Sequence, residues 1–229
     1  MSGSVDSAHL DEESKGLLRR IVERTAYRQL MAVNIRGHGI KYLTEIEEKI
    51  SLTGDIESAL NGLAAIDLLY TKLGGTELIF AVRDLMERLP YPYSKLELGM
   101  CLALVDRTER LVLESYLESR SLEMASIART LQDDLRPGTR RLEEYAARFC
   151  AEPGNRPTAQ QFLNRWIAIA IVAFGRPGSA GDKRAVELRL RTRPVEDMVR
   201  RFQSELKPFV VSLGLNMPAP SSLGIEIVT

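Results

Sequence analysis

Histidine is the side chain most often used to bind metals and to move protons near neutral pH, and this chain has only two, His9 and His38. A helical bundle can hold two metal ions when its facing helices supply glutamates and Glu-x-x-His pairs, because residues three apart share one helix face. Ile35 stands three residues before His38, and Asp6 stands three before His9. Neither histidine therefore belongs to such a pair.

Other catalytic motifs are also missing from the sequence. There is no GxxxxGK[ST] phosphate loop and no GxSxG motif, and Gly37-His-Gly39 lacks the spacing of a dinucleotide fingerprint. Zinc sites built from clusters of Cys and His are excluded by the counts of these residues. A serine or cysteine triad would have to use one of the two histidines. These absences argue against a nucleotide-hydrolysing enzyme.

A few polar residues in apolar surroundings remain as candidates. His38 lies between two glycines, where a hydrogen-bonded or exposed histidine is more common than a pocket residue. Asp106 follows the apolar run 100–105, and a buried carboxylate there needs a partner such as an arginine or a metal. A structural ion pair is the simpler interpretation. Asp133 and Asp134 precede Pro137, as is typical of a solvated helix end.

The elements that position these residues are predicted to be helices. Apolar residues recur at helical spacing, and no segment shows the sustained alternation of a strand. We predict an all-α fold, an up-and-down bundle with additional short C-terminal helices. The first helix starts near residues 11–13 and is loosened at Gly37 and Gly39. The next apolar stretch stops at Thr53-Gly54, and Asp55 caps the following helix.

The remaining helices follow from proline and glycine positions. The proline-free stretch 94–135 predicts a long central helix, interrupted near residues 119–121. Further helices are expected at 76–88, 142–149, 158–174, 183–192 and 195–213, and Pro137-Gly138 separates the central helix from the next one. We divide the chain into a flexible N-terminus (1–15), one helical domain (16–215) and a C-terminal tail (216–229).

Composition indicates a cytoplasmic helical protein without nucleic-acid or membrane partners. Lys and Arg number 31, as do Asp and Glu, so no global charge attracts nucleic acid or anionic lipid. The longest apolar run, 166–174, is about half of the roughly 20 residues that a membrane-spanning helix needs. The first 14 residues are polar, unlike a signal peptide. Cys101 and Cys150 are accordingly expected to be reduced core thiols.

Several segments resemble the ferritin-like subunits of the bacterial phenylacetyl-CoA monooxygenase (ring 1,2-epoxidase), the catalytic subunit in particular. The segment 33–43, VNIRGHGIKYL, is similar to that family's Asp-Glu-Ala-Gly-His-Gly stretch. Pro90-Tyr-Pro-Tyr93 followed by Leu102-Ala-Leu-Val-Asp106 is similar to its connector and its Leu-Val-Asp helix. The region from Trp166 to Pro218 follows its C-terminal pattern. The resemblance covers residues 20–220 and implies a ferritin-like bundle.

Carried over by this resemblance, the metal site is incomplete. His38 matches a ligand histidine, but Ile35 stands where its partner glutamate would be. Asp106 matches an acidic position of the family. Asp134 stands where the glutamate of the second Glu-x-x-His would be, and Pro137 stands where its histidine would be. His38, Asp106 and Asp134 are the metal candidates, three of about six ligands, so we expect no di-iron centre and no other cofactor. Ile35, His38, Asp106 and Asp134 are expected to surround the residual pocket.

A basic segment near the C-terminus is the other candidate site. Residues 183–207 carry an excess of four positive charges. Such a segment is usually a solvated or ion-paired surface, and the sharper interpretation is a docking surface for the phosphates of a coenzyme A ester or for an acidic partner. The residues proposed for it are Lys183, Arg184, Arg189, Arg191 and Arg193.

Three functional hypotheses follow. The first is a non-catalytic scaffold or partner subunit without a di-iron centre. The second is an oxygenase-like or metal-free enzyme acting on a CoA thioester or related acyl substrate, and the third is a small-ligand binding module in the vacated pocket. The loss of metal ligands favours the first, with a homodimer or a related ferritin-like subunit as partner. Large apolar side chains expected at the interface are Trp166, Phe174, Phe202 and Phe209.

Overall fold

The computed structural model describes residues 5–134 and 140–218, without the side chains of Asp134 and Arg140. The described residues form nine α-helices and no strand, which confirms the predicted all-α class. The helices are α1 (Glu12–Gly39), α2 (Ile46–Lys72), α3 (Leu78–Met86), α4 (Lys95–Tyr116), α5 (Leu122–Asp134), α6 (Arg140–Ala151), α7 (Arg156–Phe174), α8 (Ala180–Glu187) and α9 (Val195–Ser212).

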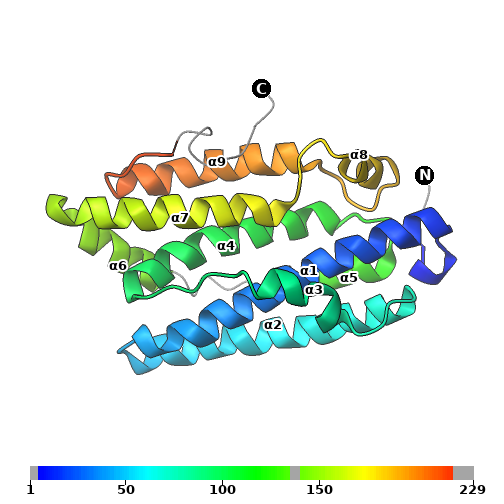
Figure 1. Cartoon of the computed structure of the whole chain (residues 1–229), viewed down its shortest axis with the longest axis horizontal. Coiled ribbons are helices and arrows are strands. Elements are labelled where there is room, and N and C mark those ends of the chain that lie inside the picture. Colours follow the sequence, from blue (N-terminus) through cyan, green and yellow to red (C-terminus); the bar gives the residue numbers. More distant parts are fainter. Residues whose placement is uncertain (1–4, 135–139, 219–229) are drawn as a thin grey trace.

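Four of these helices form a ring around a common core. Helix α1 packs against α2 and α4, and α5 packs against α2 and α4, so that each helix has two neighbours in the ring. Neighbours in the ring run antiparallel, while α2 and α4, on opposite corners, run parallel (Figure 1). The parallel pair requires a long crossover, which residues 73–94 provide by returning along the bundle through α3.

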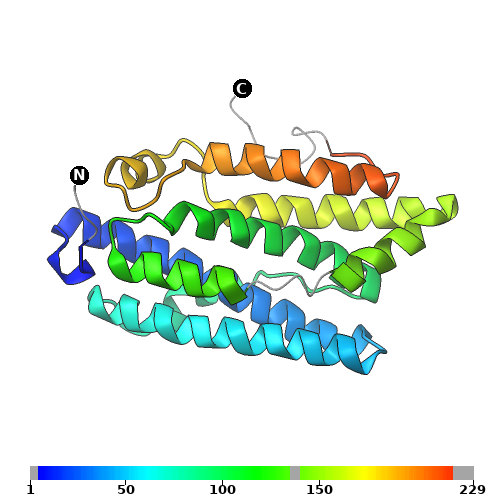
Figure 2. The ribbon, with the colours of Figure 1, turned by 180° about the vertical axis from the view of Figure 1, so that it is seen from behind.

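A second layer covers the other side of α4. Helices α6, α7 and α9 pack on α4, and α8 lies at the end of the molecule where α1 begins (Figure 2). Helix α4 is therefore shared by both layers, and 17 of its 22 residues are buried. Its first turn is capped by Ser94, whose Oγ accepts a hydrogen bond from the Glu97 backbone N–H at 3.1 Å.

None of the described helices is long and apolar enough to cross a membrane.

Residues 5–11, which we predicted to be part of a flexible terminus, are tied to the junction of α4 and α5. Val5 exchanges backbone hydrogen bonds with Arg120 and Leu122, at 2.8 and 3.1 Å. Ser7 is fully buried, and its backbone N–H donates to the Glu123 carboxylate at 2.9 Å. Asp11 then caps α1 by accepting from the Ser14 N–H at 2.8 Å.

The expected break at Thr53-Gly54 is wrong, because α2 passes through it without interruption. Buried apolar residues lie on both sides of the dipeptide, at Leu52 and Ala59, with 4% and 8% of their surface exposed. Their packing outweighs the cost of about 1 kcal/mol that a glycine imposes inside a helix. Asp55 is not a cap, since it lies inside α2.

Of the other expectations, one is met, one is wrong and two fall outside the described residues. The predicted interruption of the central helix is confirmed, since α4 ends at Tyr116 and α5 begins at Leu122. Trp166, Phe174 and Phe202 are at most 3% exposed, so the prediction that they form an interface is wrong. Pro137-Gly138 and residues 219–229 of the predicted tail lie outside the described part.

Candidate functional site

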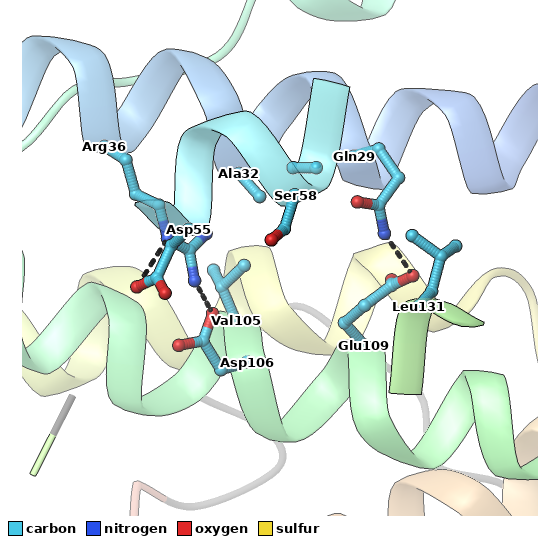
Figure 3. A pocket seen from close by; sticks show the side chains of 10 residues that line it. Gln29, Ala32, Arg36, Asp55, Ser58, Val105, Asp106, Glu109 and Leu131 are labelled. Atoms are coloured by element: carbon cyan, nitrogen blue, oxygen red, sulfur yellow. Dashed lines mark hydrogen bonds and ion pairs between the residues drawn. The ribbon is translucent and has the colours of Figure 1, made fainter. Parts of the chain in front are cut away.

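A small cavity lies at the centre of the four-helix ring, and charged side chains line it (Figure 3). Its volume is about 40 Å³, which is room for on the order of two or three water molecules. All four helices of the ring contribute to its lining: Gln29, Ala32 and Arg36 from α1, Asp55, Ser58 and Ala59 from α2, Val105, Asp106 and Glu109 from α4, and Leu131 from α5.

Arg36 joins three helices at one end of this cavity. Its Nη2 donates a hydrogen bond to Asp106 Oδ1 at 2.6 Å, and its Nε lies 3.8 Å from Asp55 Oδ2. The side chain of Arg36 is 6% exposed, and those of Asp55 and Asp106 are 14% and 19% exposed. This is the arginine partner that the position of Asp106 in the apolar run of α4 required.

A second buried cluster surrounds Glu109, one turn along α4 from Asp106. Arg28 Nε donates to Glu109 Oε2 at 2.6 Å, and Gln29 Nε2 donates to Oε1 at 2.8 Å. Arg28 Nη2 also donates to Thr25 Oγ1 at 3.0 Å. Both oxygens of the buried carboxylate are thus hydrogen-bonded, as a charged group in the core requires.

Both arginines remain firmly charged in these surroundings. Burial alone lowers the pKa of Arg36, but the charges of Asp106 and Asp55 outweigh it, so the pKa is raised. For Arg28, burial is likewise outweighed by the charge of Glu109 and by hydrogen bonds to Glu109 and Tyr116, and the pKa is raised. The two guanidinium groups therefore act as fixed positive charges beside these carboxylates.

The carboxylates around the cavity are paired with arginines. The guanidinium of Arg28 lies against the Glu109 carboxylate, and that of Arg36 lies against those of Asp55 and Asp106. Within the described ranges, no group of three or more His, Cys, Asp or Glu side chains is arranged to hold a metal ion. The arrangement is that of an ion-paired core.

Of the described side chains proposed for the residual pocket, Asp106 lines the central cavity. Ile35 and His38 lie on α1 outside its lining. Ile35 is fully buried. The His38 ring packs on Tyr91 of the crossover, with ring centroids 4.8 Å apart, and its Nε2 is buried without a hydrogen-bond partner among the described residues. Asp134 ends α5, and its side chain is outside the described part.

Most arginines proposed for docking lie near carboxylates of the same chain. Arg184 binds Glu13 through two hydrogen bonds of 2.7 and 2.8 Å, and Arg193 lies 3.9 Å from Glu114. Arg191 forms a buried ion pair with Asp182, and Arg189 has a left-handed backbone with φ 57°. Lys183 is exposed on α8. Three of the five residues, Arg184, Arg191 and Arg193, thus form ion pairs within the fold.

Sequence reasoning missed most of the residues that line the central cavity. A signal for them was present, since Arg28, Gln29 and Arg36 interrupt the apolar face of the first helix, and Asp106 and Glu109 are three apart on the central one. Buried charges on two facing helices predict a pair. Which arginine meets which carboxylate depends on helix register, which a single sequence does not provide.

Comparisons with known proteins do not assign the chain to a family. No protein-family model matches it, and neither does any curated protein.

Proposed function

We propose that the protein is a non-catalytic scaffold or partner subunit, related to the ferritin-like subunits of phenylacetyl-CoA monooxygenases. The observation that carries this proposal is the ion-paired centre of the four-helix ring, where Arg28 and Arg36 neutralise carboxylates that could otherwise bind metal. The guanidinium group of an arginine can stabilise the fold, but unlike a metal ion it cannot change its oxidation state or bind oxygen.

The helix arrangement supports the ferritin-like part of the proposal. Ferritin-like bundles have one long crossover between two helix pairs. In this chain α1 and α2 form one antiparallel pair, α4 and α5 form the other, and residues 73–94 cross between them. The cavity lies between all four helices, at the place where bundles of this type build their metal sites.

The size of the central cavity counts against the two alternative hypotheses. An altered enzyme acting on an acyl thioester, and a ligand-binding module in the vacated pocket, both need a cavity of substrate size, which is typically about 300 Å³ or more. The central cavity has about 40 Å³. A partner subunit needs no such cavity, so the proposal keeps only the first hypothesis.

A partner surface is available on the outside of the bundle. A shallow groove of about 450 Å³ lies between α1, α2 and α3 and is lined mainly by apolar side chains, including Leu60, Ile79 and Phe80. These three side chains are 49%, 56% and 61% exposed, and Leu68 on α2 is 74% exposed. Clustered exposed apolar residues are typical of protein interfaces. We expect a homodimer or a complex with a related ferritin-like subunit to cover this groove and to bury more than about 1,000 Å².

Metal analysis tests the non-catalytic part of the proposal. The protein is expressed with excess iron, purified without chelators, and its metals are counted by mass spectrometry. The expected result is far less than one iron or manganese ion per chain. Two ions per chain would refute the proposal and restore the enzyme hypothesis.

Sedimentation velocity at micromolar concentration tests the partner surface. We expect a dimer that Phe80→Glu converts to a monomer, because a charge is placed in the apolar groove. Val211→Glu is the matched control, since Val211 is 62% exposed but lies on α9, away from the groove, and this variant should stay dimeric. A strictly monomeric protein that also retains no co-purifying subunit would remove the scaffold proposal.

A further inference from the structure

A larger cavity lies at the end of the molecule where α1 begins, away from the central ion pairs. Its volume is about 280 Å³, and it is enclosed by α1, the loop 175–179, α8 and the start of α9. Five arginines line it but only one acidic residue, Asp182. The arginines are Arg20, Arg24, Arg28, Arg176 and Arg191. Such a concentration of one charge around a cavity is unusual in a chain with equal numbers of basic and acidic residues.

The carboxylates of the protein neutralise only part of this positive charge. Arg28 is paired with Glu109, and Arg191 is paired with Asp182. The Asp182 carboxylate also accepts hydrogen bonds from the backbone N–H groups of Val195 and Gly178, at 3.1 Å each. Asp182 thus has no acceptor capacity left for further arginines.

The other three arginines face the cavity without a carboxylate. In the described residues, Arg20, Arg24 and Arg176 form no ion pair, although all three line the cavity and keep contact with solvent. Arg24 is fitted closely to the cavity wall, because a side chain at Gly175 would collide with its Nη1. Gly175 itself has φ 106°, a conformation that favours glycine.

A buried donor inside the cavity wall also lacks a partner. Arg191 is 7% exposed, and its Nε has no hydrogen-bond partner among the described residues. Burial lowers the pKa of this guanidinium, and the positive charges of Arg28 and Arg24 add to the effect. Leaving such a donor unsatisfied is unfavourable, and an anion in the cavity would accept from it.

From this geometry we infer that the cavity is a binding site for a small, multiply charged anion of the phosphate class, such as inorganic phosphate, pyrophosphate or a short phosphate ester. Planar guanidinium groups match the oxygens of phosphate, and several of them converging on one cavity favour a ligand with two or more negative charges. The remaining wall is apolar, with Leu17, Ile21 and Phe174, and can accommodate a short carbon chain. The volume admits such a compound but not a whole nucleotide coenzyme.

This site is independent of the proposed scaffold function. It shares Arg28 with the Glu109 cluster, but Gln29 and Asp106, which line the central cavity, do not line it. Loss of phosphate binding would leave the metal and oligomer measurements unchanged, so the two proposals can fail separately.

Titration calorimetry at constant ionic strength tests the inference on the full chain. Phosphate, pyrophosphate and glycerol 3-phosphate are the probes, with acetate and succinate as carboxylate comparisons. We expect dissociation constants below about 1 mM for at least one phosphate probe and at least tenfold weaker binding of both carboxylates. A rise in melting temperature with the same probe is the second readout.

Two variants test whether the phosphate probes bind in this cavity. Arg24→Gln and Arg176→Gln each should weaken phosphate binding at least tenfold, and because both side chains are exposed, both variants should fold. Arg19→Gln is the matched control, an exposed arginine of α1 outside the lining, and should bind normally. The inference is overturned if no phosphate probe binds below 10 mM, if succinate binds as tightly as phosphate, or if all three variants bind like the unmodified protein.

Discussion

Replacing Arg36 with methionine tests the ion-paired core directly. Methionine has a similar length and no charge, so the change removes the guanidinium while leaving little empty space. It removes the guanidinium that contacts the carboxylates of Asp55 and Asp106, whose side chains are only 14% and 19% exposed. Breaking a buried pair by removing one partner costs about 3–5 kcal/mol. Because these carboxylates keep some solvent contact, we expect the lower end, about 3 kcal/mol at pH 7.

The assay is chemical denaturation followed by circular dichroism, with thermal unfolding as a second measure. A loss of about 3 kcal/mol corresponds to a fall in Tm of about 6–12 °C for a chain of this length. The double variant Arg36→Met/Asp106→Asn should recover at least about 1 kcal/mol, since the buried Asp106 charge that Arg36 compensates is then removed as well.

Arg83→Met is the control, because Arg83 is 59% exposed on α3 and its ion pairs are at the surface. Its cost should be within about 0.5 kcal/mol. If Arg36→Met also costs less than about 1 kcal/mol while the far-ultraviolet spectrum is unchanged, the central carboxylates do not depend on this guanidinium and our account of the cavity is wrong.

Three further predictions concern buried polar groups elsewhere. Glu97 is fully buried and accepts hydrogen bonds from Trp166 Nε1 at 3.0 Å and from Arg165 Nη1 at 2.8 Å. Glu97→Ala should therefore lower the free energy of unfolding, measured in urea, by about 3 kcal/mol. A loss under about 1 kcal/mol would contradict this. Burial raises the pKa of both Cys101 and Cys150, that of Cys101 well above its usual range. Neither thiol should react with a disulfide reagent at about pH 7.5 until urea is added. Rapid labelling of the folded protein would refute this prediction. Burial alone raises the pKa of Glu123, but hydrogen bonds from Lys72 and Ser7 outweigh burial, so the pKa is lowered. The stability that the ionised Glu123 contributes is present above about pH 4.5 and is lost as the pH falls below that value. Amide exchange at residues 5–11 should therefore accelerate below about pH 4.5, before the rest of the chain unfolds.

The sequence contains enough information for the helices but not for their pairing. The interruption of the central helix at 119–121 and the start of the last helix at residue 195 follow from local chemistry that a single sequence displays. Thr53-Gly54 misled us because a local preference was outweighed by packing on both sides of it, and packing depends on partners distant in the sequence.

The candidate sites show the same division. Asp106 was singled out correctly as a carboxylate that needs a partner, because an acid in an apolar run has a known cost. Its partner Arg36 is 70 residues away, and the larger cavity is lined both by Arg24 of α1 and by Arg191 of the loop between α8 and α9. Charge excess along the segment 183–207 indicated the neighbourhood but not the cavity, since most of those charges are used in ion pairs within the fold.

Helix α4, with 17 of its 22 residues buried between two layers, also determines how the molecule comes apart. Helices α1 and α5 of the ring and helices α6, α7 and α9 of the second layer all pack against α4. Neither layer can therefore keep its core if α4 unfolds with the other layer. The chain should therefore unfold as one cooperative unit, with α4 amides exchanging only through global opening. Cutting the chain between α5 and α6 leaves residues 140–218 without that wall, and we expect no folded fragment from that side.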